Sequence, residues 1–370
     1  MNRLLFITAY PINNKTAGQN YSLQLLIDLS HDYSVDIIYW NYPNHNTTIK
    51  NIKNLNVIME LNTNSVLKTL YYSIIKCSFP LFTVRYNSFV YKWLKQNQNN
   101  YDMIYFDFSQ TFIYSKPIIH PYKVMMCHDI IAQKYQRKKF SFLYNWLVRM
   151  TEKNLLKNGN SIFTFSAKDK FLIKSMYGMN SEIVPFYIGK EILDINLKDI
   201  EIENYFVFYG AWNRKENSDG LKWFIKEVYP SCKDTNIKII GGALDTEIKV
   251  LISNYTNIEY LGFINNPYKI IAKSKAIIAP LFSGAGVKVK VIEALALGTP
   301  IIGTDIAFEG IDNIISDNRK FLIKANNKKD FIEKIKKHCD INSEEKSKAQ
   351  KIFINNYNEG KFIEKIKSII

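Results

Sequence analysis

The stretch from Ala279 to Gly310 is the feature of this chain that most constrains its fold. Its sequence, APLFSGAGVKVKVIEALALGTPIIGTDIAFEG, indicates a strand, a glycine loop, a helix, a short strand and a second loop in that order. Gly284 and Gly286 lie in the loop that opens directly onto the helix. Glycine lets the backbone approach a ligand closely, and the free N–H groups and dipole of a helix N-terminus favour negative charge. The segment therefore predicts a phosphate-binding loop.

Charged side chains at the start of this helix indicate the kind of ligand. Lys288 and Lys290 add positive charge there, and Glu293, three residues after Lys290, shares its face of the helix. Cations suit phosphates, and a carboxylate suits hydroxyl groups. We expect these side chains, with the backbone of Gly284, Ala285, Gly286 and Val287, to bind a nucleotide sugar.

On these residues the chain resembles the retaining glycosyltransferases of the GT-B fold, called family 4 or group 1. Those enzymes typically carry two glutamates separated by seven residues, and the second bonds the nucleotide ribose. Glu293, followed by Ala-Leu-Ala-Leu-Gly-Thr-Pro, matches the second glutamate, whereas the first falls on Ala285, which has no carboxylate. The loop is most similar to that of the family branch whose donor loop has the sequence Gly-Ala-Gly-Val-Lys.

The resemblance implies further site residues near the first strands. His128 follows the strand-like run KVMMC, where the resembled enzymes often place a histidine close to the donor sugar. We expect His128 to orient the sugar, with Glu293 as its partner in the catalytic set; the alternative is a histidine that only caps a loop. Gly18 lies in a strand-to-helix turn and is expected at the donor site, although glycine is also common in loops that bind nothing.

The segment VFYGAWNRKENSDGLKWF resembles the strand and basic loop that supply an arginine and a lysine to the diphosphate. The usual positions hold Ala211 and Asn217, while Arg214 and Lys215 lie between them. These two cations either reach the phosphates by another route or belong to a solvated loop.

The nucleotide base is expected near Phe263 and Ile264, which follow the run IEYLG. No Asp-x-Asp sequence occurs in the chain, so the usual carboxylate clamp for a divalent metal is missing. We predict transfer without a metal or a cofactor, with retention implied by the resemblance.

The alternation of apolar and amphipathic runs predicts an α/β protein with parallel sheets. A chain of 370 residues with 47% hydrophobic content is long enough for two domains. The expected architecture is GT-B, with two doubly wound Rossmann-like domains that face a central cleft. The predicted divisions are an acceptor-binding domain over 1–187, a donor-binding domain over 188–352, and a helix over 353–370 that crosses back to the first domain.

The expected strands are the short apolar runs of the two halves. They are Leu4–Tyr10, Val35–Trp40, Met103–Phe106, Val124–Cys127, Ile162–Phe165, Phe206–Tyr209, Ile237–Ile240, Ile258–Leu261, Ala276–Pro280 and Ile301–Gly303. The irregular, charged stretch from Val184 to Asn204 is expected to link the domains.

Composition indicates the compartment. No stretch reaches the roughly 20 apolar residues of a membrane span, and the start MNRLLFITAYPINN breaks too early for a signal peptide. We therefore expect a cytoplasmic protein. The four cysteines are scattered without metal-like spacing, which favours free thiols over zinc or disulfides.

The net charge of +15 is uneven, because residues 1–185 hold 21 Lys and Arg against 10 Asp and Glu. A basic surface suits nucleic acid, anionic lipid or an acidic acceptor, and no nucleic-acid-binding motif is present. An anionic membrane surface on the inner face of the cell membrane is therefore an expected partner. A monomer or weak homodimer is the expected assembly.

Two segments, Lys68–Lys95 and Lys134–Lys157, mix basic, aromatic and aliphatic residues. Such segments either lie on lipid or pack their apolar face against the sheet and leave their charges in water. We expect packing for most of the apolar residues, with Arg137, Lys138 and Lys139 as surface contacts.

Three functions remain open from the sequence. The first is a transferase that adds a sugar to a surface glycan or lipid-linked intermediate. The second is a GT-B epimerase or hydrolase, for which the missing first glutamate leaves room. The third is a nucleotide-sugar or glycan binding protein without activity.

Overall fold

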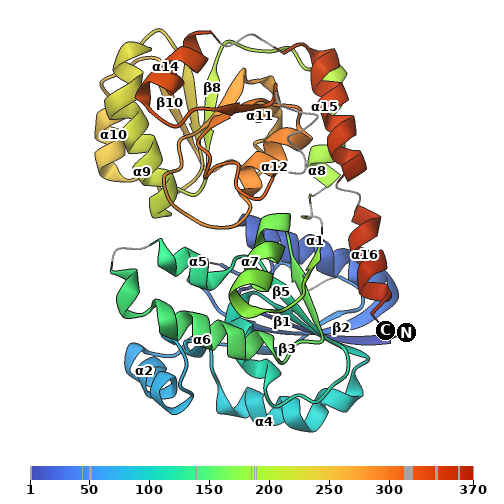
Figure 1. The fold of residues 1–370 in the computed structure, drawn as a ribbon. Helices are drawn as coiled ribbons and strands as arrows, with labels where there is room; N and C mark the ends of the chain where they lie inside the picture. The colour runs from blue at the N-terminus through green and yellow to red at the C-terminus, as the bar shows by residue number, and fades with distance from the viewer. Residues whose placement is uncertain are drawn as a thin grey trace. The chain divides into compact units, whose positions relative to one another are not determined.

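The computed structural model describes residues 2–43, 45–49, 52–137, 140–184, 186, 188, 190–311, 320–337, 341–356 and 359–369. The chain divides into two compact units, the first made of residues 1–187 and 359–370 and the second of residues 188–358. Each unit is a parallel β-sheet flanked by helices (Figure 1). That the units face each other across a cleft stays a prediction.

The first unit has a seven-stranded sheet in the order β3-β2-β1-β4-β5-β6-β7. Its strands are β1 Asn2–Thr8, β2 Tyr33–Trp40, β3 Leu55–Leu61, β4 Met103–Asp107, β5 Lys123–Cys127, β6 Ser161–Thr164 and β7 Glu182–Ile183. All pairs are parallel, and β4 and β5 are buried along their whole length. Continuous burial is expected for strands covered on both faces. The strand order reverses between β1 and β4, which is where ligands bind in doubly wound sheets.

The described helices of the first unit differ in how their first turns are capped. They are α1 Ala17–Asp32, α2 Val66–Ile75, α3 Pro80–Thr83, α4 Ser88–Asn97, α5 Ile131–Gln136, α6 Asn145–Leu156, α7 Ala167–Tyr177 and α16 Glu359–Lys367. Short 3₁₀ turns lie at η1 Gln98–Asn100, η2 Ser109–Ser115 and η3 Ser141–Leu143. The side chains of Thr16, Ser65 and Ser166 accept hydrogen bonds from the first turns of α1, α2 and α7, which satisfies donors that have no partner within the helix.

The second unit has a six-stranded sheet in the order β10-β9-β8-β11-β12-β13. Its strands are β8 Phe206–Tyr209, β9 Ile237–Ile240, β10 Ile258–Gly262, β11 Ala276–Ala279, β12 Ile301–Gly303 and β13 Leu322–Lys324. Here the order reverses between β8 and β11. The second unit therefore repeats the plan of the first.

Helices α8 Lys190–Leu193, α9 Lys215–Trp223, α10 Thr246–Ile252, α11 Tyr268–Lys273, α12 Val289–Ala296, α14 Lys328–Lys336 and α15 Ser343–Asn356 complete the second unit. Shorter turns are η4 Leu197–Asp199, the π-helical turn η5 Phe224–Val228 and η6 Tyr229–Ser231. A Cβ on Gly220 would lie 2.2 Å from the carbonyl oxygen of Pro280. Only glycine lets α9 approach the loop after β11 this closely.

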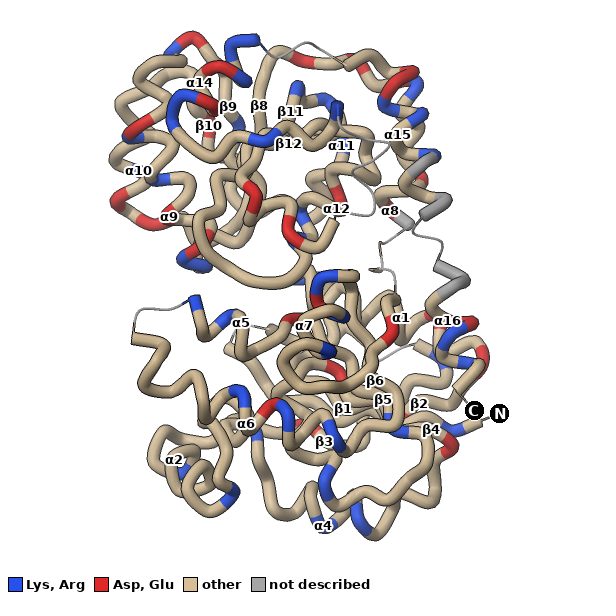
Figure 2. Tube along the Cα trace, in the orientation of Figure 1, with Lys and Arg blue, Asp and Glu red and all other residues tan. Residues whose placement is uncertain are grey.

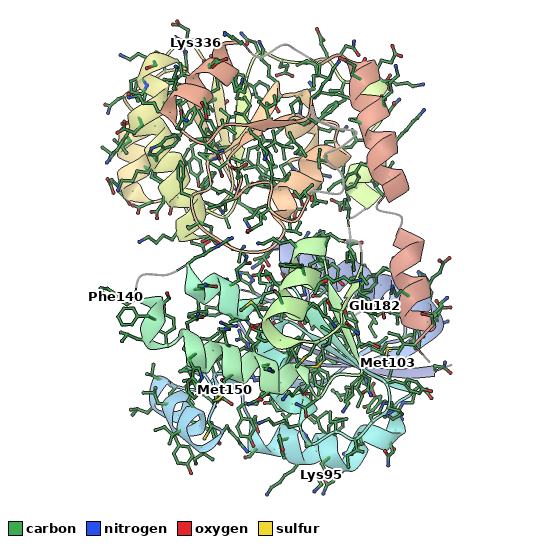
Figure 3. All side chains as sticks on the ribbon, in the orientation of Figure 1. Lys95, Met103, Phe140, Met150, Glu182 and Lys336 are labelled. Carbon is green, nitrogen blue, oxygen red and sulfur yellow. The ribbon has the colours of Figure 1, made fainter. Side chains whose placement is uncertain are left out.

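The C-terminal segment forms two helices. Phe353 on α15 is buried, and contacts of α15 with α12 and η4 place it in the second unit. Phe362 and Ile366 on α16 are buried in the first unit, where Phe362 contacts the ring of Phe163. Lys365 pairs with Glu182, which Figure 3 labels beside α16. The bounds 353–370 of the crossing helix stay a prediction; within the described residues Phe353 lies on α15, the part in the first unit begins at Glu359, and Tyr357 lies outside the described residues.

The predicted strands are confirmed within one or two residues at their ends. The largest difference is at the first strand, which is Asn2–Thr8 instead of Leu4–Tyr10. Three strands were missed: β3, β7 and β13. The expected irregular link from Val184 to Asn204 contains α8 and η4.

The expectation that the apolar residues of Lys134–Lys157 pack against the sheet is wrong for four of them. Phe140, Phe142, Leu143 and Trp146 are all at least 69% exposed, and Figure 3 shows Phe140 pointing away from the ribbon. Val148, Leu155 and Leu156 are buried as expected. Arg137 is exposed, while Lys138 and Lys139 lie outside the described residues.

Candidate functional site

The glycine loop of the second unit connects β11 to α12. Gly284 and Gly286 have φ angles of 119° and 69°, which side chains other than glycine rarely adopt. Lys288 is the N-cap residue of α12, and its amine donates to the carbonyl oxygens of Ala285 at 3.0 Å and Gly286 at 2.6 Å. Ala285 and Val287 are half-buried. The amine of Lys288 thus links the start of α12 to the carbonyl groups of the loop.

Lys290 lies in the first turn of α12 and is held from the neighbouring segment. Its amine donates to Asn217 Oδ1 at 2.8 Å, and Asn217 Nδ2 donates to the carbonyl oxygen of Ala211 at 2.9 Å. A Cβ on Gly210 would lie 3.1 Å from the Lys290 amine. Glycine at the end of β8 therefore makes room for both side chains.

Burial makes the charge of Lys290 costly. Lys290 keeps part of its surface accessible, but the protein packed around its amine lowers its pKa to about 7. The positive charges of Arg214 and Lys288 lower the pKa further, against the opposing effect of Glu216 and Glu293. An amine in a positively charged and partly desolvated site is suited to bind an anion.

Glu293 is buried on the next turn of α12. The hydroxyl of Tyr268 donates to Glu293 Oε1 at 3.3 Å, and Tyr209 also hydrogen-bonds this carboxyl. Burial raises the pKa of Glu293 to about 7, while the two phenols and Lys290 oppose the rise. Glu293 also contributes to holding the pKa of Tyr209 well above its usual range, although burial is the larger cause.

The other predicted donor residues lie on neighbouring segments of the second unit. Arg214 is the N-cap residue of α9, and Lys215 begins that helix; both are exposed. Phe263 and Ile264 follow β10, and Phe263 is 63% exposed. Of these four, Arg214 lies close enough to influence the pKa of Lys290.

The first unit holds a second cluster at the ends of β1, β4 and β5. His128 Nε2 lies 2.6 Å from Asp107 Oδ1. Asp107 is fully buried, and its other oxygen accepts from Thr8 Oγ1 at 2.9 Å and Ser22 Oγ at 2.6 Å. A carboxylate so anchored fixes the imidazole and requires a proton on Nε2, which leaves Nδ1 for another partner.

Aromatic rings surround His128 on several sides. Phe108 stacks on the imidazole with centroids 3.8 Å apart, and Tyr21 and Phe165 contact it edge-on. Phe108 has a φ of 65°, a strained value for a residue with a side chain. A Cβ on Gly18 would lie 3.0 Å from Phe108 Cζ and 3.9 Å from His128 Nδ1. Gly18 and His128 are thus neighbours, as their predicted roles require.

Both clusters lie at the point where the strand order of their sheet reverses. Asp107 ends β4 and pairs in register with Thr8 at the end of β1. In the second unit, Gly210 follows β8 and the glycine loop follows β11. Binding at the carboxyl ends of strands at such a point is general for open α/β sheets.

Sequence reasoning missed several residues of these clusters. The sequence marks Asp107 as a possible site residue, because Asp107 follows an apolar strand in the same way as His128. The sequence does not mark Tyr268 and Tyr209, since their contact with Glu293 depends on packing between α11, β8 and α12. Within the described ranges, no group of three His, Cys, Asp or Glu side chains could hold a metal ion.

Residues 203–340 match the model of the family described as Glycosyl transferases group 1. No curated protein matches the chain.

Among solved structures, sucrose-phosphate synthase from Thermosynechococcus elongatus superposes with a TM-score of 0.70 at 12% identity, covering 100% of this chain and 98% of that one. TarM from S. aureus, in a complex that contains UDP, gives a TM-score of 0.68 at 14% identity and covers 100% and 99%. Anabaena HepE in complex with UDP-glucose gives 0.64 at 13% identity, with coverage of 100% and 99%.

These matches establish the fold as GT-B, with two parallel-sheet α/β domains. The family match over residues 203–340 supports a glycosyltransferase of group 1. The matched region contains the whole cluster of the second unit, from Tyr209 to Glu293.

Proposed function

We propose that the protein is a glycosyltransferase that moves a sugar from a nucleotide diphosphate sugar to a glycan or lipid-linked acceptor in bacterial surface polysaccharide biosynthesis. The observation that carries this proposal is the cluster of the second unit. A glycine loop, the half-buried Lys290 and the buried Glu293 lie at the reversal point of the sheet, inside the region that matches the family.

In this proposal the second unit binds the donor. The N–H groups of the loop 284–287 and the amines of Lys288 and Lys290 bind the diphosphate, and Glu293 bonds the ribose. Arg214 and Lys215 approach the phosphates from α9. Phe263 and Ile264 contact the base, because an exposed aromatic ring offers a stacking surface.

The first unit supplies His128 to the reaction. The bond between the anomeric carbon and the diphosphate oxygen breaks, the acceptor oxygen bonds to that carbon on the same face, and the acceptor proton passes to the leaving diphosphate. Asp107 fixes His128, so that the free Nδ1 bonds a sugar hydroxyl. The charge on the leaving group is balanced by lysine and helix dipole, without metal or cofactor.

The proposed enzyme acts in the cytoplasm as a monomer or weak homodimer. None of the helices in the described part of the chain has the length and apolar character needed to cross a membrane.

A second candidate function is binding without transfer, as in a GT-B epimerase, hydrolase or inactive sugar-binding protein. It is favoured by Ala285, which stands where the resembled enzymes carry a carboxylate. Loss of that carboxylate removes a partner for the donor sugar but leaves the predicted phosphate and ribose contacts in place.

Nucleotide titration tests the donor site. UDP, GDP, ADP and dTDP are titrated into wild type and Glu293→Ala, with and without magnesium. We expect one nucleotide to bind equally well in both conditions and to lose affinity in the variant. Equal binding by the variant would contradict the role of Glu293. Product analysis with the matching nucleotide sugar then separates transfer from epimerisation, hydrolysis and simple binding.

A further inference from the structure

Helix α2 presents its apolar side to water. Thr69 is its buried residue, and the hydroxyl of Ser73 lies 2.6 Å from that of Thr83 on the protein side. The outward residues are aliphatic or aromatic: Val66, Leu67, Leu70, Tyr71, Ile74 and Ile75, which are 47% to 81% exposed. A surface helix of a globular protein normally has the opposite orientation. The exposed side of α2 is therefore built to contact something apolar.

A second apolar group lies at the turn η3 and the start of α6. Phe140, Phe142, Leu143 and Trp146 are each 69% to 76% exposed. Aromatic and leucine side chains are costly to expose, and contiguous exposed groups of them mark interaction surfaces. We call α2 and this second group together the apolar surface.

Phe79 connects the two parts of the apolar surface. Phe79 follows α2, and its backbone N–H donates to Thr151 Oγ1 on α6 at 3.0 Å. Its ring lies 4.9 Å from that of Tyr135, which precedes the second group, and 6.1 Å from that of Tyr144, which lies within it between Leu143 and Trp146. Both parts therefore belong to one side of the first unit, where Figure 1 shows α2 beneath α6.

The charged residues within the two segments that form the apolar surface are all positive. Residues 61–101 contain five Lys and Arg and no Asp or Glu, and residues 130–151 also contain no acidic residue. Figure 2 shows blue segments and no red on the trace of α2 and α4. Lys92 and Lys95 on α4 are exposed, as is Arg149 on α6. A partner that is apolar and negatively charged fits this pattern.

We propose that the apolar surface docks the first unit on an anionic lipid bilayer. The aliphatic residues of α2 and the aromatic residues at η3 insert at the level of the headgroups and upper acyl chains. The surrounding lysines and arginines bind the lipid phosphates. A lipid surface fits better than a second copy of this chain, because a second copy would bring the same positive charges against each other.

Vesicle binding tests the proposal. The full chain is mixed with vesicles of phosphatidylcholine alone or with 30% phosphatidylglycerol, and bound protein is separated by flotation. We expect binding to the anionic vesicles that weakens with salt. The variant Leu67→Ser/Leu70→Ser/Ile74→Ser should bind at least tenfold more weakly, and so should Phe142→Ser/Trp146→Ser. Replacing Arg149 by Glu should weaken binding about fivefold or more, since each basic residue near the surface contributes about that factor.

Val250→Ser is the matched control, because Val250 on α10 is also exposed, at 61%, but belongs to the second unit. It should bind vesicles within twofold of wild type. Trp146 gives a second measurement on the unaltered surface, since brominated lipids should quench its fluorescence in wild type and much less in Trp146→Phe. Affinity for the nucleotide identified by the titration should stay unchanged in every variant, which separates this proposal from the proposed function.

Three results would overturn the docking proposal. They are wild-type protein that does not float with anionic vesicles, variants that bind as tightly as wild type, and absence of Trp146 quenching. A wild-type dimer that the same substitutions convert to monomer, without lipid binding, would assign the apolar surface to a second copy instead.

Discussion

Lys290 gives the sharpest test of the donor site, because its charge depends on the ligand. In the free protein burial lowers its pKa to about 7, from 10.5 for an unperturbed lysine. A diphosphate beside the amine favours the charged form and raises the pKa. Binding above pH 7 therefore takes up a proton, and the affinity should be highest below pH 7 and fall as the pH rises.

The size of the effect follows from the fraction of amine that must be protonated. At pH 8, one unit above the pKa, protonation costs about 1.4 kcal/mol, and at pH 6 it costs less than about 0.1 kcal/mol. The affinity should thus be about tenfold higher at pH 6 than at pH 8. In Lys290→Met the affinity at pH 6 should fall about tenfold or more, because a hydrogen bond to a charged group is lost, and the proton uptake by Lys290 should disappear.

Titration calorimetry measures both quantities. The sugar conjugate of the nucleotide found by titration is the suitable ligand, since its diphosphate is esterified at both ends and does not titrate near neutral pH. Buffers of different ionisation enthalpy report the proton uptake, which should approach about one proton per site at pH 8. Lys329→Met, on the exposed side of α14, is the matched control and should retain the wild-type profile.

The pKa of Glu293 is also about 7, so its titration contributes to the pH dependence of donor affinity. As the pH rises, Glu293 loses its proton, and the negative charge of its carboxylate favours the charged form of Lys290. The donor affinity therefore falls less steeply with pH. The variant Glu293→Gln removes this second titration and should show the steeper dependence. A wild-type affinity that is constant from pH 6 to pH 8 without proton uptake would refute the reasoning about Lys290.

Three further predictions concern single contacts. Asp107→Asn removes the carboxylate that fixes His128, so kcat should fall by about tenfold to a hundredfold, with donor KM within about twofold. Gly210→Ala places a methyl group about 3 Å from the Lys290 amine, and should weaken donor binding in calorimetry at least about fivefold. Glu152→Ala leaves two backbone N–H groups at the start of α5 and one phenol without their acceptor, which should lower the free energy of unfolding in urea by about 3 kcal/mol.

Each of these predictions has its own control. Ser22→Ala removes one of the two hydroxyl donors to Asp107 and should give a smaller loss of kcat than Asp107→Asn; a larger loss would contradict the anchoring argument. Gly178→Ala, at a site with nothing near the added methyl group, should leave donor affinity unchanged. Glu333→Ala, on the surface of α14, should change stability by less than about 0.5 kcal/mol.

The sequence predicted the architecture well because short apolar runs in parallel sheets are buried on both faces and stand out. Phe206–Tyr209 and Ile237–Ile240 matched the structure at both ends. β3 was not predicted because it is an edge strand with half-exposed residues, and its sequence LNVIMEL has no continuous apolar run. β7 and β13 are only two and three residues long.

The orientation of α2 could not be predicted from its pattern. An amphipathic period indicates which residues share a face, but not which face lies against the protein. The usual rule would bury Leu67, Leu70 and Ile74, whereas the structure buries Thr69 and exposes the other three. Likewise, the partners of Glu293 come from β8 and α11, which the sequence leaves far apart.

The two clusters differ in how their buried charged groups are stabilised. In the second unit, the Lys290 amine and the Glu293 carboxyl are both shifted by burial to a pKa of about 7, so their charge responds to what binds. In the first unit, Asp107 is fully buried but receives hydrogen bonds on both oxygens from Thr8, Ser22 and His128. Its charge is already satisfied, so it can hold the imidazole in one orientation. In the proposed transferase, the responsive pair serves the binding of a charged donor, and the fixed pair serves the alignment of an uncharged sugar.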